Sequence, residues 1–175
     1  MWQKIIKIRP LILFLIMLPF IASCNDEDDI NAIFVGQTWY LGNFYTTSNW
    51  KDDNKSKPVY YTNTDEGKDV LSLINNNGTG VFYIAFQEKT FTAKGAGNTF
   101  SGTWLADGKK NTLVMNITSG SAPSGGDLSS RISRDFYNSI KNTRFYLGNI
   151  YYLKFFPEDK KSYIQVSKNR IEKTN

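Results

Sequence analysis

Residues 81–118 read VFYIAFQEKTFTAKGAGNTFSGTWLADGKKNTLVMNIT, and this stretch decides the fold class. Four runs rich in β-branched and aromatic residues are separated by short turn signals such as Asp107-Gly108. Runs of this length and spacing are typical of an antiparallel meander, so the stretch predicts a mainly β domain. The runs cover residues 81–86, 90–94, 99–106 and 111–118.

Alternation of apolar residues within these runs predicts which faces line the core, because successive side chains of a strand point to opposite sides. Several strands with one apolar face each must curl or meet a second sheet, since an open sheet would expose its edges. We therefore expect a small, closed or nearly closed barrel, with a β-sandwich as the rival. The expected core faces are Phe82, Ile84 and Phe86 in the first run and Leu113, Met115 and Ile117 in the last.

Two helices are expected beside the strands. Thr64 is placed to cap a short helix that ends before Gly78. Asp127 is placed to cap a second helix that continues to about Asn142. Apolar residues recur through this second segment at helical spacing, so it should be amphipathic and either cap a barrel end or lie against the sheet.

Further strands are expected on both sides of the meander. A β-rich run opens the domain at residues 36–45, and Gly42 within it predicts a bulge or a barrel corner. After the second helix, residues 144–156 are expected to form one strand and residues 162–167 another. The predicted domain spans residues 36–168 and is followed by a polar tail over 169–175.

The first 23 residues predict a signal peptide: a positively charged start leads into an apolar run that ends at Ile21-Ala22-Ser23-Cys24. The uncharged stretch 10–23 is too short to span hydrocarbon, which takes about 20 residues. The tetrad resembles the lipobox of bacterial lipoproteins. This resemblance implies that Cys24 carries lipid and anchors the mature protein to a membrane.

The residues after Cys24 read Asn25-Asp26-Glu27-Asp28-Asp29, and such a run of like charge favours a solvated tether, here over residues 24–35. The run also resembles the acidic export signal that follows the lipidated cysteine in surface-displayed lipoproteins of the Bacteroides group. The resemblance implies an outer-membrane lipoprotein, with exposure at the cell surface as the further expectation.

The order of elements resembles the lipocalin-like and META (HslJ-like) families of small envelope β-barrels. The resemblance rests on an opening strand around Trp39, a strand over 100–104, and a helix that leads into a closing hairpin with 151–155 and 163–166. It implies a lipocalin-like envelope barrel whose function is uncertain.

Residue types restrict the chemistry. The chain has no histidine and one cysteine, Cys24, so catalytic triads, thiol nucleophiles and histidine-based zinc sites are excluded once that cysteine carries lipid. We expect no cofactor, no metal site and no catalytic residue. Lysines are scattered singly rather than clustered in a stripe, which argues against nucleic acid as a partner. A carboxylate pair for glycan hydrolysis remains as an unfavoured alternative, drawn from Asp52, Asp53, Glu88 and Asp135.

The candidate binding residues are Trp50, Tyr60 and Tyr61, which lie in the long polar stretch 46–64. Large aromatic side chains in a polar loop need either a packing partner or a ligand. If they fold back they pin the loop, and if they stay exposed they form a surface for a protein or glycan partner. We therefore expect a noncatalytic binding or scaffolding lipoprotein.

A lipocalin-like carrier of a small apolar ligand is the main alternative. It requires a hollow barrel, whereas the expected inward faces carry side chains large enough to fill a small one. These side chains are Phe82, Phe86, Phe100, Trp104 and Phe155.

Overall fold

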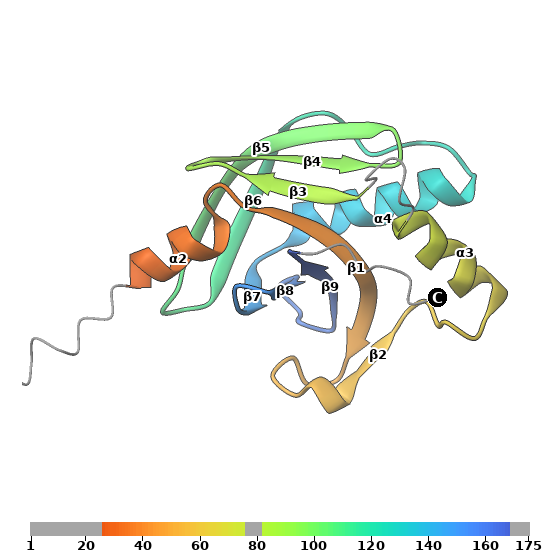
Figure 1. Cartoon of the computed structure of the whole chain (residues 1–175), viewed down its shortest axis with the longest axis horizontal. Coiled ribbons are helices and arrows are strands. Elements are labelled where there is room, and N and C mark those ends of the chain that lie inside the picture. The colour runs from red at the N-terminus through yellow and green to blue at the C-terminus, as the bar shows by residue number, and fades with distance from the viewer. Residues whose placement is uncertain (1–25, 76–81, 169–175) are drawn as a thin grey trace, which may run out of the picture.

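A closed antiparallel barrel makes up most of the computed structural model, which describes residues 26–75 and 82–168 (Figure 1). The sheet has the order β2-β1-β3-β4-β5-β6-β7-β8-β9, and an additional pairing of β1 with β9 closes the ring. The expected mainly β class and the closed barrel are confirmed. The strands are β1 (Thr38–Thr47), β2 (Ser56–Pro58), β3 (Tyr83–Phe86), β4 (Thr90–Gly95), β5 (Asn98–Asp107), β6 (Thr112–Ser119), β7 (Phe145–Gly148), β8 (Tyr152–Phe156) and β9 (Ser162–Ser167).

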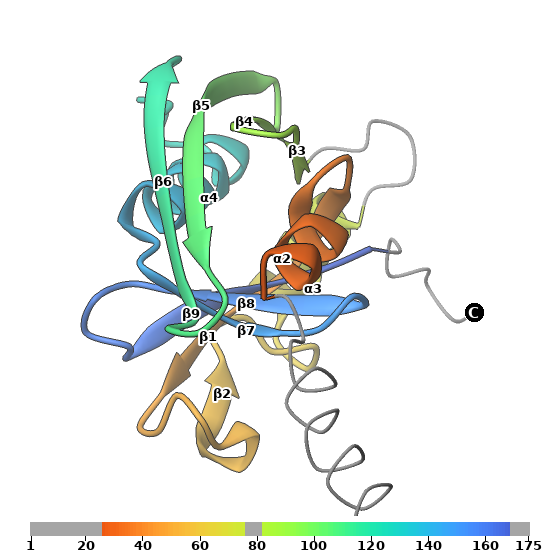
Figure 2. The ribbon, with the colours of Figure 1, turned by 90° about the vertical axis from the view of Figure 1, so that its left-hand side faces the viewer.

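Helices cover the two ends of the barrel (Figures 1 and 2). α2 (Asp26–Phe34) precedes β1 at one end, whereas α3 (Asp65–Ile74) and α4 (Leu128–Asn142) pack together at the other. Both predicted N-caps are confirmed. The Thr64 side chain accepts a hydrogen bond from the Gly67 amide, and the Asp127 side chain accepts one from the Ser130 amide.

Large side chains fill the barrel. The predicted core faces of β3 and β6 are confirmed, with Ile117 partly rather than fully buried. On α4, Ile132, Phe136 and Ile140 are fully buried in the same core, and Leu128 is partly buried against it. The aromatic residues expected to fill the barrel, Phe82, Phe86, Phe100, Trp104 and Phe155, all belong to this core or pack against it.

The expected solvated tether is wrong for most of its length. Residues Asp26–Phe34 form α2, and Phe34 is completely buried. Its ring lies 5.1 Å from that of Phe86 and 5.2 Å from that of Tyr146, between centroids. The Trp39 indole also donates a hydrogen bond to the Ile33 carbonyl. Burial of one phenylalanine and these contacts hold the segment against the barrel, although its first residues carry like charges.

The expected single strand over 144–156 is also wrong, because β7 and β8 form a hairpin there. Gly148 ends β7 with φ 141°, and a Cβ at this position would lie 2.2 Å from the Tyr152 carbonyl oxygen. The Asn149 side chain then accepts hydrogen bonds from the amides of Tyr151 and Tyr152. Glycine and asparagine thus supply the turn.

The bulge predicted at Gly42 is confirmed, since the pairing of β1 with β9 shifts by one residue between Leu41 and Asn43. The signal peptide, Cys24, the stop at Gly78 and the tail over 169–175 lie outside the described residues. Among the helices that the structure describes, none is long and apolar enough to cross a membrane.

Candidate functional site

A pocket of about 310 Å³ opens at the barrel end where β1 finishes, beside α4 and the turn between β8 and β9. Its apolar lining comes from Phe44, Phe155 and Ile164, which belong to the barrel core. Val59 and Tyr60 line it from the segment that follows β2. The volume is at the lower end of the range for small-molecule sites, roughly 300–1,000 Å³.

One side of α4 forms a polar wall of this pocket. Asp135, Asn138, Ser139 and Asn142 line it, and their spacing places them on one face of the helix. The amphipathic character predicted for this helix therefore has two consequences, because its apolar side enters the core and the edge of its polar side lines the pocket.

Tyr60 is held at the pocket by contacts to β1. The buried Asn43 side chain donates a hydrogen bond to the Tyr60 carbonyl at 3.1 Å. The Val59 amide donates to the Phe44 carbonyl at 2.8 Å, and the rings of Phe44 and Tyr60 meet edge to face at 5.9 Å between centroids. Burial raises the pKa of the Tyr60 hydroxyl, and the negative charge of Asp135 raises it further.

Asp135 is a half-buried acid in the pocket wall. Burial raises the pKa of its carboxyl, and the charges of Arg134 and Arg131 oppose this shift. Both arginines are engaged elsewhere: Arg131 pairs with Glu66 of α3, and Arg134 donates to backbone carbonyls of the preceding loop. Among residues 26–75 and 82–168, none donates a hydrogen bond to the Asp135 carboxylate.

The side-chain amides of Asn138 and Asn142, which neighbour Asp135 on α4, are also open to a ligand. Within the described part of the chain, the side chains of Asn138 and Asn142 make no hydrogen bond to protein, whereas the Ser139 hydroxyl donates to the Asp135 carbonyl. The wall thus offers one carboxylate and two amides to a ligand. Sequence reasoning named Asp135 only as an acid, although its spacing to Asn138 and Asn142 on an amphipathic helix was a readable signal.

Of the three aromatic residues singled out from the sequence, the structure brings Tyr60 alone into the lining of this pocket. Tyr61 is exposed. Trp50 lies against the outer face of the barrel, with its ring 5.8 Å from that of Phe145 and 5.6 Å from that of Phe156. The structure therefore places the three rings in three different surroundings, and Trp50 pins its loop.

The four acids considered for glycan hydrolysis are also separated. Asp53 pairs with Lys154, and Asp52 caps the short 3-10 helix Asp53–Lys55. Glu88 lies in the turn between β3 and β4, and Asp135 lies in the pocket. No group of three His, Cys, Asp or Glu side chains in the described ranges is arranged to hold a metal ion.

Comparison with known proteins assigns the chain to a family. A model described as a domain of unknown function, DUF4847, matches residues 25–168, and the chain belongs to this family. A crystal structure of a DUF4847 family protein from Bacteroides vulgatus ATCC 8482 is 33% identical to it with a TM-score of 0.68. That match covers 82% of this chain and 99% of the other.

A second solved structure shares the fold alone. It is an NMR structure of a protein from Burkholderia xenovorans, 9% identical with a TM-score of 0.53, and the match covers 81% of this chain and 88% of the other. No curated protein matches the chain. These findings do not bear on the resemblance to lipocalin-like and META barrels.

Proposed function

We propose that this protein is a noncatalytic saccharide-binding lipoprotein of the outer membrane, and that the pocket beside α4 is its binding site. This reading keeps the glycan partner expected from the sequence and moves the site from the polar loop as a whole to Tyr60 and α4. A protein partner is the competing occupant of the same surface.

The lining supports a ligand with one apolar face and a hydroxyl-bearing edge. Val59 and Tyr60, which keep exposed area in the lining, offer apolar and aromatic surface on which the C–H face of a sugar ring packs. Asp135 and the two asparagines offer acceptors and donors for neutral hydroxyl groups. A small apolar molecule would leave these polar groups without partners, at a cost of about 1–3 kcal/mol for each one that it buries.

The observation that carries the proposal is the state of Asp135. This carboxylate lines the pocket together with Tyr60, partial burial raises its pKa, and no described residue donates a hydrogen bond to it. Its oxygens remain accessible to water, so a ligand that enters the pocket can replace that water as their hydrogen-bond donor. Sugar hydroxyls are such donors.

A noncatalytic role is favoured by the single acid of the lining. Glycoside hydrolysis uses two carboxyl groups roughly 5–9.5 Å apart across the scissile bond. Asp135 is the only acid among the described residues that line the pocket. A lipocalin-like carrier role is disfavoured because large core side chains fill the barrel.

Attachment to the membrane through Cys24 belongs to the same proposal, on the strength of the sequence Ile21-Ala22-Ser23-Cys24. Metabolic labelling with a fatty acid should mark the wild-type protein and leave a Cys24→Ala variant unmarked. A wild-type protein that incorporates no lipid would refute this part. Protease shaving of intact cells separates outward from periplasmic exposure.

Saccharide binding is tested with an array of bacterial and host glycans. Wild-type protein should bind at least one glycan class, and the Asp135→Ala and Tyr60→Ala variants should lose that binding. Lys57→Ala is the matched control, since Lys57 is exposed on β2 outside the pocket lining. Release of a cleaved glycan by the wild-type protein would overturn the noncatalytic claim.

A further inference from the structure

Exposed apolar side chains are divided unequally between the two ends of the barrel. Val59 and Tyr61 lie at the end that carries the pocket. The other large exposed apolar side chains of the described residues lie at the end covered by α2. They are Leu105, Val114, Ile150, Tyr151 and Tyr152.

Strand register places these residues at the α2 end. β1 begins there at Thr38, and Tyr40 pairs with Ser167, which pairs in turn with Tyr152. The turn between β7 and β8 is therefore at the start of β1. The turn between β3 and β4 is at the same end, because Thr38 pairs with Ala85. The turn between β5 and β6 is there too, because Thr103 pairs with Thr90 at the start of β4 and β5 continues from there to Asp107.

We name the exposed residues around this end the α2 rim, and its composition suits a membrane surface. Leu105 and Val114 are cross-strand partners on the outer face, and Tyr151 is 69% exposed at the tip of a turn. The exposed lysines Lys89, Lys109 and Lys110 lie in the neighbouring turns. Tyrosine, aliphatic side chains and lysine stems together are typical of surfaces that rest at the headgroup level.

The chain places this rim close to the expected anchor. Cys24 stands two residues before Asp26, where α2 begins. A nine-residue helix is about 13.5 Å long, and two extended residues add about 7 Å. Because α2 is packed onto the barrel through Phe34, the anchor is held within about 20 Å of the α2 end. A solvated tether over the same residues would reach about twice as far.

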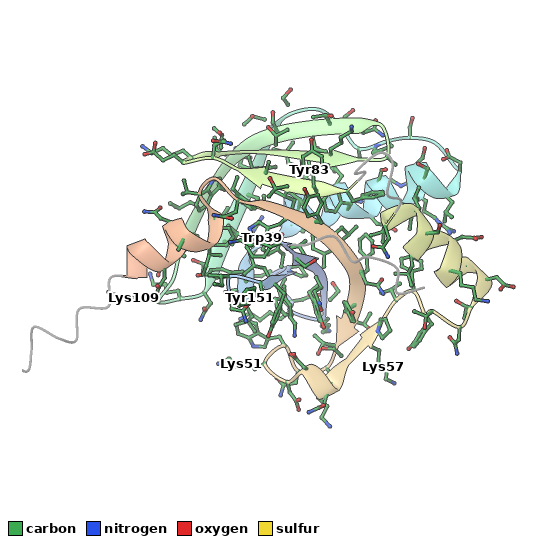
Figure 3. The ribbon with its side chains drawn as sticks, viewed as in Figure 1. Trp39, Lys51, Lys57, Tyr83, Lys109 and Tyr151 are labelled. Carbon is green, nitrogen blue, oxygen red and sulfur yellow. The ribbon has the colours of Figure 1, made fainter. Side chains whose placement is uncertain are left out.

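We propose that the α2 rim rests on the surface of the phospholipid bilayer that holds the lipid of Cys24, so that the pocket end faces away from the membrane. The inference rests on the lipidation in the proposed function and fixes an orientation for it. In Figure 3, Lys109 and Tyr151 lie toward the side of α2, whereas Lys57 lies at the lower side with β2.

The charge near the anchor indicates which lipid surface fits. The acidic run 25–29, together with Glu88 and Asp107 in the turns of the rim, opposes contact with an anionic surface. The lysines of the rim favour such contact, although Lys110 pairs with Asp107. With the two charges opposed, apolar and aromatic contacts should dominate. We therefore expect rim contact on zwitterionic phosphatidylethanolamine vesicles and little change in that contact as salt is raised.

Single-cysteine labelling tests the orientation in the mature, lipidated protein. Cys24 is the only cysteine of the chain, so once it is lipidated an introduced cysteine is the sole free thiol. Lys109→Cys and Tyr151→Cys report on the rim, and Lys57→Cys and Glu158→Cys report on the opposite end. Each is labelled with an environment-sensitive fluorophore and reconstituted in phosphatidylethanolamine vesicles with and without spin-labelled lipid.

Labels at the two rim positions should shift their emission to the blue and be quenched by spin-labelled lipid, while labels at the other two should do neither. Equal behaviour at all four positions would mean that the domain tumbles at its anchor and would overturn the proposal. A protein without lipid on Cys24 would overturn it as well. The readout is membrane contact alone, so failure of saccharide binding leaves its outcome unchanged.

A second variant separates the rim from the anchor. Replacing Leu105 and Tyr151 together by serine should abolish quenching at position 109 while the lipid stays attached. The matched control replaces Val59 and Tyr61 by serine, which removes two exposed apolar side chains from the opposite end. Quenching at position 109 that survives the rim variant would contradict the inference.

Discussion

The buried ammonium of Lys154 is paired with the carboxylate of Asp53, which lies 101 positions earlier in the chain. The Lys154 side chain is 8% exposed, and that of Asp53 is 71% exposed. Lys154 Nζ also lies 5.3 Å from the ring centroid of Tyr163. The pair joins the loop after β1 to the outer face of β8, where a second set of aromatic side chains packs outside the barrel core.

Breaking this pair from the acidic side should destabilise the fold. Asp53→Asn leaves a buried ammonium without its counter-charge, and we expect a loss of about 1–2 kcal/mol in the free energy of unfolding, less than for a fully buried pair because Asp53 is exposed. Lys154→Met removes the charge and keeps the length, so Asp53→Asn should cost little in that background. Denaturant unfolding of the four proteins measures this, and equal costs in both backgrounds would contradict the pairing.

Trp50 should act on stability. Its ring packs on Phe145 and Phe156, and Lys160 Nζ lies 4.4 Å from its centroid. Trp50→Ala should therefore lower the free energy of unfolding by about 2 kcal/mol, below the value for a fully buried aromatic residue. Tyr61→Ala, at an exposed site, should change it by no more than about 0.5 kcal/mol. Thermal unfolding of both variants tests this packing role. If Trp50 served only to bind a partner at the surface, neither substitution would change the melting temperature.

Much of the barrel could be predicted because its strands alternate cleanly. Phe82, Ile84 and Phe86 repeat every second residue between turn signals, and such a pattern fixes which face is buried. The two helix caps were also predictable, since Thr64 stands directly before an acidic first turn, Asp65-Glu66, and Asp127 stands directly before apolar residues at helical spacing.

The sequence did not predict α2, which depends on tertiary contacts, or the turn between β7 and β8, whose signal is short. α2 begins with a run of acids, and it is the long-range packing of Phe34 against Phe86 that orders it. Gly148-Asn149 is a recognisable turn pair, but the aromatic residues on both sides favoured one long strand.

The pocket was missed because it is assembled from distant parts of the chain. Tyr60 reaches it through Asn43, and Asp135 reaches it from α4. Sequence alone names such residues singly and does not place them together.

Asp135→Asn should stabilise the protein at neutral pH. The pKa of this carboxyl is raised above its ordinary value of 3.8 because burial disfavours the charged form. A group whose pKa is raised by folding stabilises the protein while it is protonated, below its unfolded pKa. That stabilisation is lost as the pH rises through the folded pKa, so ionised Asp135 lowers the free energy of unfolding at pH 7. The gain from asparagine should disappear as the pH falls below about 3.8. Unfolding curves across pH 3–7 check this, and a gain that grows on acidification would contradict it.

Ser133→Ala should leave stability unchanged or raise it by up to about 1 kcal/mol. The Ser133 hydroxyl is buried, has no hydrogen-bond partner among residues 26–75 and 82–168, and lies within α4, where alanine is the better helix former. Ser139→Ala is the matched comparison in the same helix, because its hydroxyl donates to the Asp135 carbonyl and its removal should bring a smaller gain. Melting temperatures of the two variants report the difference, and a clear loss in Ser133→Ala would show that its hydroxyl has a partner.

An equilibrium titration of the saccharide that the array identifies tests the central claim most directly, with wild-type protein and the Asp135→Asn variant compared at pH 7. If the Asp135 carboxylate accepts hydrogen bonds from sugar hydroxyls, asparagine should weaken binding roughly tenfold or more, since a hydrogen bond to a charged group contributes about 1.5–3 kcal/mol. Wild-type affinity should also fall as the pH drops through the raised pKa of Asp135. Unchanged affinity in Asp135→Asn, or no saccharide binding by the wild-type protein, would contradict the account.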